Sequence, residues 1–356
     1  MEKVLIYPFN YNFFTILNHC NKISDIEINS LVSPSGWGLC NKEYNVNNII
    51  TKVTNDFQSE LKKNSLVWFV DSKENLDLEK FIIPKLKVAL KEGKKILYTR
   101  DDLNKISRYI SHYEFKKINE WNLEKYEIRD IEGISQINTP IIFICGLYGG
   151  LDTFDVNIRI GEELRKRGFS ILQFGPKKES YLFKMIPIPE FMFDDSISSK
   201  TKIINFNHFI KDKEVEAKPD LIIIEVPGEL FPFSRKMVGN FGIRAFEISN
   251  AVINDCGILC IPSSIYDREY CEELKYFIKG RHGINIDYFS IEKKVIDTYE
   301  TEVKQKFSYM SLDENFFVED IEDYEKIFFI HDNKQLLELV DNIVNQLKEY
   351  AKVISI

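Results

Sequence analysis

Ile141-Ile-Phe-Ile-Cys-Gly146-Leu-Tyr-Gly149-Gly150-Leu151-Asp152-Thr153 is the stretch that decides the fold of this 356-residue sequence. An apolar run of strand length is followed by three glycines within five residues, and then by a pattern that predicts a helix over 155–166. A glycine-rich turn between a buried strand and a helix presents backbone N–H groups and the positive end of a helix dipole, which suits an anion. The stretch therefore indicates an α/β fold with a ligand loop at a strand end.

The same glycines also fit a tight turn that only needs positive φ and close packing of helix on strand. Against the phosphate-loop pattern G-x-x-x-x-G-K-[ST], Gly146 and Thr153 fit, but Leu151 replaces the second glycine and Asp152 replaces the lysine. A carboxylate at the lysine position repels the γ-phosphate of ATP. The glycine spacing does not meet the dinucleotide pattern G-x-G-x-x-G. A structural turn, a divergent ligand loop and a nucleotide site all stay open.

A second segment supports a phosphate-loop ancestry. Residues 221–225 form a predicted buried strand that ends in Glu225, and the turn Pro227-Gly228 follows. In phosphate-loop enzymes an acid at this place holds Mg²⁺ directly or through water. The layout resembles dethiobiotin-synthetase-type enzymes, although such a strand end is the usual ligand position in any open α/β sheet. The candidate ligand- or anion-binding residues are Gly146, Gly149, Gly150, Asp152, Thr153, Glu225 and Gly228, with Glu225 the candidate catalytic residue and no metal-ligand cluster.

Strands and helices alternate on both sides of these segments, which predicts two tandem three-layer, doubly wound α/β domains. Residues 101–136 are charged and weakly periodic and supply the boundary, so we expect a Rossmann-like domain over 1–136 and a degenerate phosphate-loop-like domain over 137–356. Predicted strands lie at 3–7, 26–32, 65–70, 95–98, 141–145, 169–174, 221–225, 257–261, 284–289, 307–310 and 326–330. Predicted helices lie at 13–19, 56–63, 78–92, 155–166, 199–211, 241–254, 267–279 and 335–350.

Two further segments are candidates for binding. In the first domain the strand ends point to the loop 33–38 and to Asp71. Gly36 allows a ligand to approach the backbone and Trp37 offers a face for stacking, or the tryptophan merely fills a gap. The candidate residues of this N-terminal cleft are Ser35, Gly36, Trp37 and Asp71. The apolar, proline-punctuated run 184–193 suits either a bound peptide or a lid on the protein's own core.

Composition excludes several classes of function. The chain has 47 basic and 55 acidic residues, a net charge of −8 and a pI near 5.4, which argues against nucleic-acid binding. No apolar run approaches the roughly 20 residues of a membrane helix, and the N-terminal run is too short for a signal peptide. Six cysteines in a chain this long do not make a disulfide scaffold, so we expect a cytoplasmic protein. Cys145 is either a core residue or a nucleophile at the helix start.

Six segments, in their order and spacing, resemble the clostridial peptide-maturation-system proteins, which are encoded beside radical SAM maturases and short Cys-rich precursor peptides. They are Leu31-Val-Ser-Pro-Ser-Gly-Trp-Gly-Leu39, Phe69-Val-Asp-Ser72, the Gly146 loop, Pro189-Glu-Phe-Met-Phe-Asp194, Pro219-Asp-Leu-Ile-Ile-Ile224 with Pro227-Gly228, and Phe241-Gly-Ile-Arg-Ala-Phe-Glu-Ile-Ser-Asn-Ala-Val252. The similarity covers nearly the whole chain. It implies a role in ribosomal natural-product biosynthesis of the bacteriocin type, but it supplies no catalytic residues.

Two functions follow as hypotheses. In the first, the chain binds the precursor peptide, its modifying radical SAM enzyme, or both, and the glycine loop holds a peptide carboxylate or another anion. In the alternative, it is a ligase or kinase that activates a peptide carboxylate with ATP and Mg²⁺. Thr153 and Glu225 would then hold the metal, and Lys177 or Lys178 would replace the missing lysine.

A nicotinamide-dependent oxidoreductase ranks last, because the residues after the first strand, Pro8-Phe-Asn-Tyr-Asn12, contain no glycine. We expect no nucleic-acid or membrane partner, and the sequence leaves a homodimer open.

Overall fold

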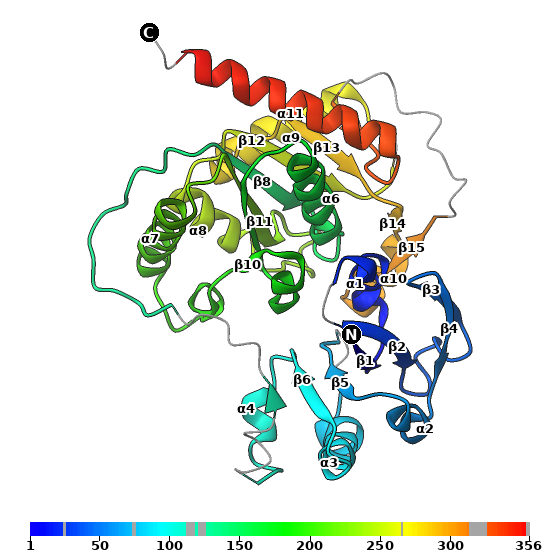
Figure 1. Ribbon diagram of the computed structural model, residues 1–356. Coiled ribbons are helices and arrows are strands. Elements are labelled where there is room, and N and C mark those ends of the chain that lie inside the picture. The colour runs from blue at the N-terminus through cyan, green and yellow to red at the C-terminus, as the bar shows by residue number, and fades with distance from the viewer. Residues whose placement is uncertain are drawn as a thin grey trace. The chain divides into compact units, whose positions relative to one another are not determined.

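The computed structural model describes residues 1–23, 26–72, 76–111, 118–119, 126–264, 266–312 and 326–353 (Figure 1). The chain divides into two compact units, Met1–Glu124 and Lys125–Ile356. Each unit is built on a largely parallel sheet flanked by helices, so the expected α/β class is confirmed.

The sheet of the first unit has the order β3-β4-β2-β1-β5-β6-β7. Its strands are β1 (Glu2–Tyr7), β2 (Ile26–Val32), β3 (Glu43–Val46), β4 (Ile49–Thr54), β5 (Leu66–Phe69), β6 (Lys95–Tyr98) and β7 (Ile118–Asn119). Its helices are α1 (Phe14–Asn18), α2 (Phe57–Lys62), α3 (Ile83–Lys91) and α4 (Leu103–Ile106), with short turns η1 (Tyr11–Phe13) and η2 (Cys20–Lys22) and the π-helical segment η3 (Leu78–Ile82). The Asp56 side chain caps α2, accepting the Ser59 N–H at 3.0 Å.

Alternating side chains of the parallel strands form the two faces of this sheet. Leu5 and Phe69 pack in one core cluster with residues of α2 and α3. Trp68 points to the opposite face, where its ring meets Phe13 of η1 with centroids 5.1 Å apart. The chain thus covers both faces, as a doubly wound sheet requires.

The hairpin of β3 and β4 was not predicted. These strands are antiparallel and are joined by Asn47 and Asn48, with φ of 50° and 65°. Two successive residues with positive φ make the tight turn whose twist matches that of the flanking strands, and asparagine tolerates this conformation better than most residues. An Asn-Asn pair carries this signal more weakly than Asn-Gly does.

The sheet of the second unit is parallel throughout, in the order β10-β9-β11-β8-β12-β13-β16. Its strands are β8 (Ile141–Gly146), β9 (Ile171–Gly175), β10 (Ile186–Pro187), β11 (Leu221–Glu229), β12 (Cys256–Ile261), β13 (Tyr288–Ile291) and β16 (Ile327–Phe328). A separate two-stranded ribbon pairs β14 (Lys294–Ile296) with β15 (Tyr309–Ser311), so the edge strand expected at 307–310 belongs to this ribbon.

The helices of the second unit lie in two layers. They are α6 (Thr153–Lys166), α7 (Ser199–Ala217), α8 (Ile243–Ala251), α9 (Arg268–His282), α10 (Thr298–Lys304) and α11 (Asn333–Val353), with η4 (Lys178–Phe183) and η5 (Glu190–Phe193). The crossover through α6 runs along the sheet in the direction opposite to those through α7, α8 and α9, so right-handed connections place α6 on the other face. Accordingly α11 packs on α6, whereas α7 packs on α8 (Figure 1).

The topology determines which residues meet at the carboxyl edge of this sheet. β8 is central and pairs with β11 and β12, so the glycine loop after β8 lies beside the ends of those two strands. Glu225 is level with Ile144 in the register, close to the loop. Among the residues that the structure describes, no helix is both long and apolar enough to cross a membrane.

Candidate functional site

The glycine loop connects β8 to α6 and is held by its neighbours on both sides. The Leu147 N–H donates to Cys260 O at 3.0 Å, and the Leu230 N–H donates to Gly146 O at 3.2 Å. A Cβ at Gly146 would lie 3.2 Å from Tyr148 O and 3.3 Å from the Thr153 methyl, and Gly150 has φ +87°. Glycine thus suits both positions: Gly146 for close packing, and Gly150 for a backbone conformation that other residues rarely adopt.

Thr153 and Glu225 are brought together. The Thr153 hydroxyl donates to Glu225 Oε1 at 2.8 Å, and Asn157 Nδ2 donates to Oε2 at 3.3 Å. Glu225 is 2% exposed, and burial raises the pKa of its carboxyl to about 6, against the lowering effects of Lys177 and of the two hydrogen bonds. Of the two lysines suggested as replacements, Lys177 is thus close to Glu225, and its ammonium lies 4.8 Å from the centre of the Phe154 ring. Lys178 begins η4.

Asp152, at the lysine position of the phosphate-loop pattern, forms an ion pair. Its carboxylate lies 2.5 Å from the ammonium of Lys294, the first residue of β14. Lys294 also donates to Gly150 O at 3.4 Å. A lysine therefore reaches the loop, although it lies 144 residues after Gly150 in the chain. Its positive charge is offset by the carboxylate of Asp152.

The start of α6 already contacts a carboxylate. The backbone N–H of Asp152 donates to Oε1 of Glu292, the residue that follows β13. Glu292 is 3% exposed, and burial raises its pKa well above the usual range, with the charge of Asp152 adding to the effect. The chain's own acid thus lies where an anion would bind to the helix N-terminus.

Aromatic residues cover the rest of the loop. The Tyr309 hydroxyl donates to Gly149 O at 2.6 Å, and the Phe307 ring stacks on that of Tyr309 with centroids 5.8 Å apart. Phe307 also packs against Tyr148 and Phe233. The ribbon of β14 and β15 therefore supplies both the lysine and the apolar cover of the loop.

Gly149 and Gly228 have different environments. A Cβ at Gly149 would lie 3.2 Å from the Glu229 carboxylate and 3.4 Å from Phe307, so a larger residue there would have to displace these side chains slightly. Gly228 has φ +84° with open space around it, and its carbonyl oxygen lies beside Gly146. It turns the end of β11 so that Glu229 follows against the loop.

Glu292 and Lys294 were missed in the sequence. Their signal is the charged run Glu292-Lys293-Lys294 directly after the apolar strand β13, hence at the same sheet edge as the glycine loop. Because β12 lies between β8 and β13, only the strand order reveals that this run reaches the loop.

The N-terminal candidates do not form one cluster. Ser35 is exposed and accepts a hydrogen bond from Asn55 at 3.0 Å, Gly36 has φ +92°, and Trp37 is half-buried. These residues follow β2, whereas Asp71 follows β5, and β1 lies between the two strands. No hydrogen bond or ion pair joins loop 33–38 to Asp71 within the described ranges of the first unit.

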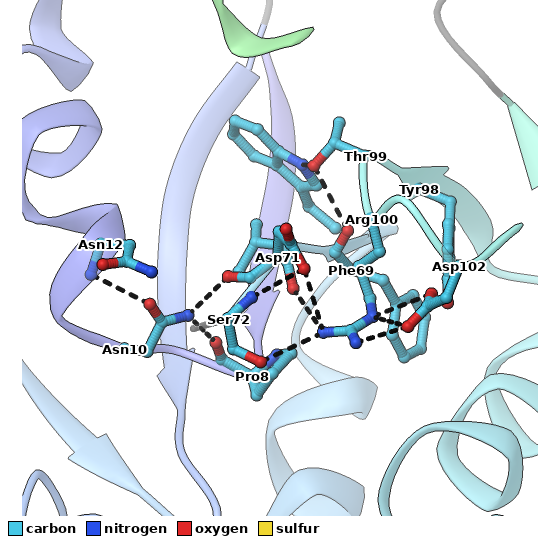
Figure 2. A network of polar contacts seen from close by, with 12 residues as sticks. Pro8, Asn10, Asn12, Phe69, Asp71, Ser72, Tyr98, Thr99, Arg100 and Asp102 are labelled. Carbon is cyan, nitrogen blue, oxygen red and sulfur yellow. Dashed lines mark hydrogen bonds and ion pairs between the residues drawn. The ribbon is translucent and has the colours of Figure 1, made fainter. Parts of the chain in front are cut away.

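Asp71 belongs instead to the network in Figure 2, which ties the ends of β1, β5 and β6 together. Asn10 Nδ2 donates to Pro8 O at 2.8 Å and to Asp71 O at 2.9 Å. The buried Arg100 guanidinium contacts the Asp102 carboxylate through Nε and Nη2, at 3.2 and 2.6 Å, and donates to Val70 O at 3.2 Å. Since the protein's own groups occupy this arginine, the network fixes the strand ends.

The remaining candidates are core residues. Cys145 is fully buried and burial raises its thiol pKa, which opposes a role as nucleophile. In the run 184–193, Ile188, Phe191 and Met192 pack in the core, so much of this segment covers the protein's own interior. No group of three or more His, Cys, Asp or Glu side chains suited to a metal occurs in the described part of the chain.

Comparison with solved structures supports the fold. A DUF1611 family protein from Anabaena variabilis has a TM-score of 0.55 at 10% identity, covering 85% of this chain and 91% of that chain. A plasmid partition protein from Borrelia burgdorferi gives 0.33 at 12% identity (60% and 98% covered), and the MinD cell division protein from Aquifex aeolicus gives 0.34 at 11% (58% and 98%).

The sequence matches no protein-family model and no curated protein. At 10% identity the DUF1611 likeness shows the fold alone. The chain therefore has an α/β fold with parallel-strand sheets flanked by helices, and both the phosphate-loop ancestry of the second unit and the resemblance to peptide-maturation proteins stay predictions.

Proposed function

We propose that this chain is a binding component of a ribosomal peptide-maturation system, and that its glycine loop recognises a carboxylate of the precursor peptide. One observation carries the proposal: the N–H at the start of α6 already binds a carboxylate, that of Glu292. A position that holds the chain's own carboxylate has the hydrogen-bonding geometry to hold one from a ligand.

The charges at the loop favour a singly charged group over a triphosphate. The carboxylates of Asp152 and Glu229 border the loop, together with the buried carboxyl group of Glu292, whose raised pKa favours the neutral form. Lys294 is paired with Asp152, so its charge is largely offset. A polyanion would meet repulsion from these acids, whereas a single carboxylate can exchange with one of them. The peptide and the radical SAM enzyme as partners rest on the family resemblance.

Calorimetric titration with a short Cys-rich precursor peptide, the partner that the family resemblance implies, tests the proposal. We expect saturable binding that weakens at least about tenfold when the peptide is amidated and its Asp and Glu residues are replaced by Asn and Gln, because hydrogen bonds to charged groups are worth about 1.5–3 kcal/mol. Binding that ignores these changes would exclude carboxylate recognition, and absence of binding would overturn the function.

A matched pair of variants locates the site. Lys294→Ala should weaken peptide binding about tenfold, because Lys294 donates to the loop. Lys293→Ala is the control, since the neighbouring ammonium lies over the Phe329 ring, 5.4 Å from its centre. Equal effects of the two substitutions would place the peptide elsewhere.

A nucleotide-dependent ligase or kinase is the second candidate, favoured by the 2.8 Å hydrogen bond between Thr153 and Glu225. Hydroxyl and carboxylate oxygens are suitable Mg²⁺ ligands, and this pair would hold the ion in such an enzyme. Asp152 at the lysine position does not fit the phosphates. Tight binding of ATP–Mg²⁺, with turnover that Glu225→Gln abolishes in a folded protein, would establish this candidate and displace the first.

A further inference from the structure

The acid at the start of α6 lacks one of its own partners. Glu292 Oε1 accepts the Asp152 N–H, but Oε2 is buried and has no hydrogen-bond donor among the residues described. The Lys294 ammonium lies 3.9 Å from Oε2 and is directed to Asp152 and Gly150 O. A buried carboxyl group with one oxygen that lacks a hydrogen-bond partner is costly to the folded state.

The loop itself is accessible from outside. The side chain of Asp152 is 36% exposed and that of Lys294 is 24% exposed, whereas that of Glu292 is 4% exposed. α6 has 14 residues, long enough for a substantial dipole at its N-terminus. An external group can therefore reach the ion pair of Asp152 and Lys294 at the helix start, whereas Glu292 reaches the same helix start from within the protein.

We propose that the N-terminus of α6, with Lys294, is an exchangeable carboxylate site: Glu292 fills it in the free protein, and a ligand monocarboxylate displaces Glu292 on binding. This proposal deepens the proposed function and rests on it for the identity of the ligand as a peptide. The Asp152 N–H serves both occupants, so the two exclude each other, and Lys294, which lies 3.9 Å from Glu292 Oε2, turns to the ligand when Glu292 leaves.

Acetate is the matched probe. Glu292→Ala keeps Cβ and removes the two carbons and two oxygens that acetate contains. In this variant we expect acetate to raise the thermal midpoint in a saturable manner, because a ligand that binds only the folded state stabilises it. Acetamide, which has the same shape without the charge, and chloride at equal ionic strength should have no such effect.

Glu214→Ala is the control variant for acetate. The Glu214 carboxylate is buried and accepts the N–H groups of Asn138 and Thr139, both at 2.8 Å, but these lie before β8, at the opposite edge of the sheet. Saturable stabilisation of Glu292→Ala alone supports the site. Equal responses of Glu214→Ala, or none in Glu292→Ala, would overturn it.

Exchange is tested with the peptide. Without the internal competitor, Glu292→Ala should bind the peptide about tenfold more tightly than the wild type, as expected for a site that is open in a tenth of the molecules. If Glu292→Ala fails to fold, Glu292→Gln carries the test: its neutral amide is a weaker acceptor, so affinity should still rise. Unchanged or weaker affinity in the folded variant would exclude competition.

The two proposals fail separately. Acetate bound by Glu292→Ala with no peptide bound by any form would retain the carboxylate site and remove the peptide function. Peptide bound by the wild type with no acetate in Glu292→Ala would retain the function and overturn exchange.

Discussion

Glu225 is a buried acid whose protonation is coupled to folding. Burial raises its pKa to about 6, from the usual value of 4.5 for a glutamate. The folded state therefore binds a proton more tightly than the unfolded state does. The stabilisation that the protonated Glu225 side chain gives to the folded state is fully present below pH 4.5, and it is lost as the pH rises through about 6.

Glu225→Gln should remove this pH dependence. We expect the free energy of unfolding of the variant, relative to wild type, to increase by about 2 kcal/mol between pH 4 and pH 7, since a shift of one pKa unit corresponds to about 1.4 kcal/mol. Urea unfolding at both pH values measures it. The changed hydrogen bond to Asn157 alters the free energy of unfolding by a nearly constant amount at all pH values. A difference between variant and wild type that does not depend on pH would therefore contradict the raised pKa of Glu225.

The cysteines make a prediction about reactivity. All six fall within the described residues: Cys40 is partly exposed, and the other five are buried. A thiol reagent should modify native Cys40 first, and Cys145 only as fast as the protein opens, because the reagent must reach a thiolate. Mass spectrometry of the labelled peptides measures the order. Early labelling of Cys145 would restore it as a candidate nucleophile.

At the scale of elements, the β3–β4 hairpin depends on its two-residue turn. Asn48 is exposed and has φ +65°, a conformation that β-branched side chains rarely adopt. Asn48→Val should therefore destabilise the protein by about 1–2 kcal/mol, whereas Asn48→Gly should be neutral or stabilising. Asn45→Val is the control, because Asn45 is exposed within β3. Similar denaturation midpoints for both valine variants would argue against a turn effect.

Local signals predicted most elements. The bounds of β2 and β6 agree with the expected 26–32 and 95–98, because apolar runs of strand length end at clear breakers. The helix 78–92 has its predicted extent, but its first turn, η3, is π-helical. The hairpin at Asn47 was missed because its turn consists of only two residues, Asn47 and Asn48, both with positive φ. An Asn-Asn pair is a weak signal for such a turn.

The site was predictable only where its residues follow the loop or a neighbouring strand end. Thr153 and Glu225 follow from strand–loop–helix patterns, and they meet as expected. Glu292 and Lys294 could not be assigned to the site from their spacing in the sequence. They reach the loop only because β12 pairs with β8 and β13 pairs with β12 in the sheet. The order of the strands in the sheet, which no local sequence pattern encodes, brings these two residues to the site.

At the scale of the whole molecule, each unit has its own hydrophobic core. Trp37 and Trp68 lie in the first unit, and the third tryptophan of the sequence, Trp121, lies outside the described residues; the fluorescence of Trp37 and Trp68, measured in a Trp121→Phe background, therefore reports on the first unit, whereas far-UV circular dichroism reports on both. Ile223→Ala, at a fully buried position of β11, should cost about 3 kcal/mol and lower the dichroism transition without moving the fluorescence transition.

Val67→Ala is the converse variant. Val67 is fully buried in β5 of the first unit, so its truncation should lower the fluorescence transition. If Ile223→Ala moves both signals together, the two units unfold as one cooperative body.

The central place of β8 has a consequence for synthesis. β8 is the first strand of its sheet to be made, but its neighbours β11 and β12 end at residues 229 and 261. A nascent chain therefore carries this apolar strand with both edges open while more than 80 residues are added, roughly four to sixteen seconds at bacterial elongation rates. We expect chains interrupted before residue 221 to aggregate or to be retained by chaperones, because the glycine loop cannot form before its sheet closes around it.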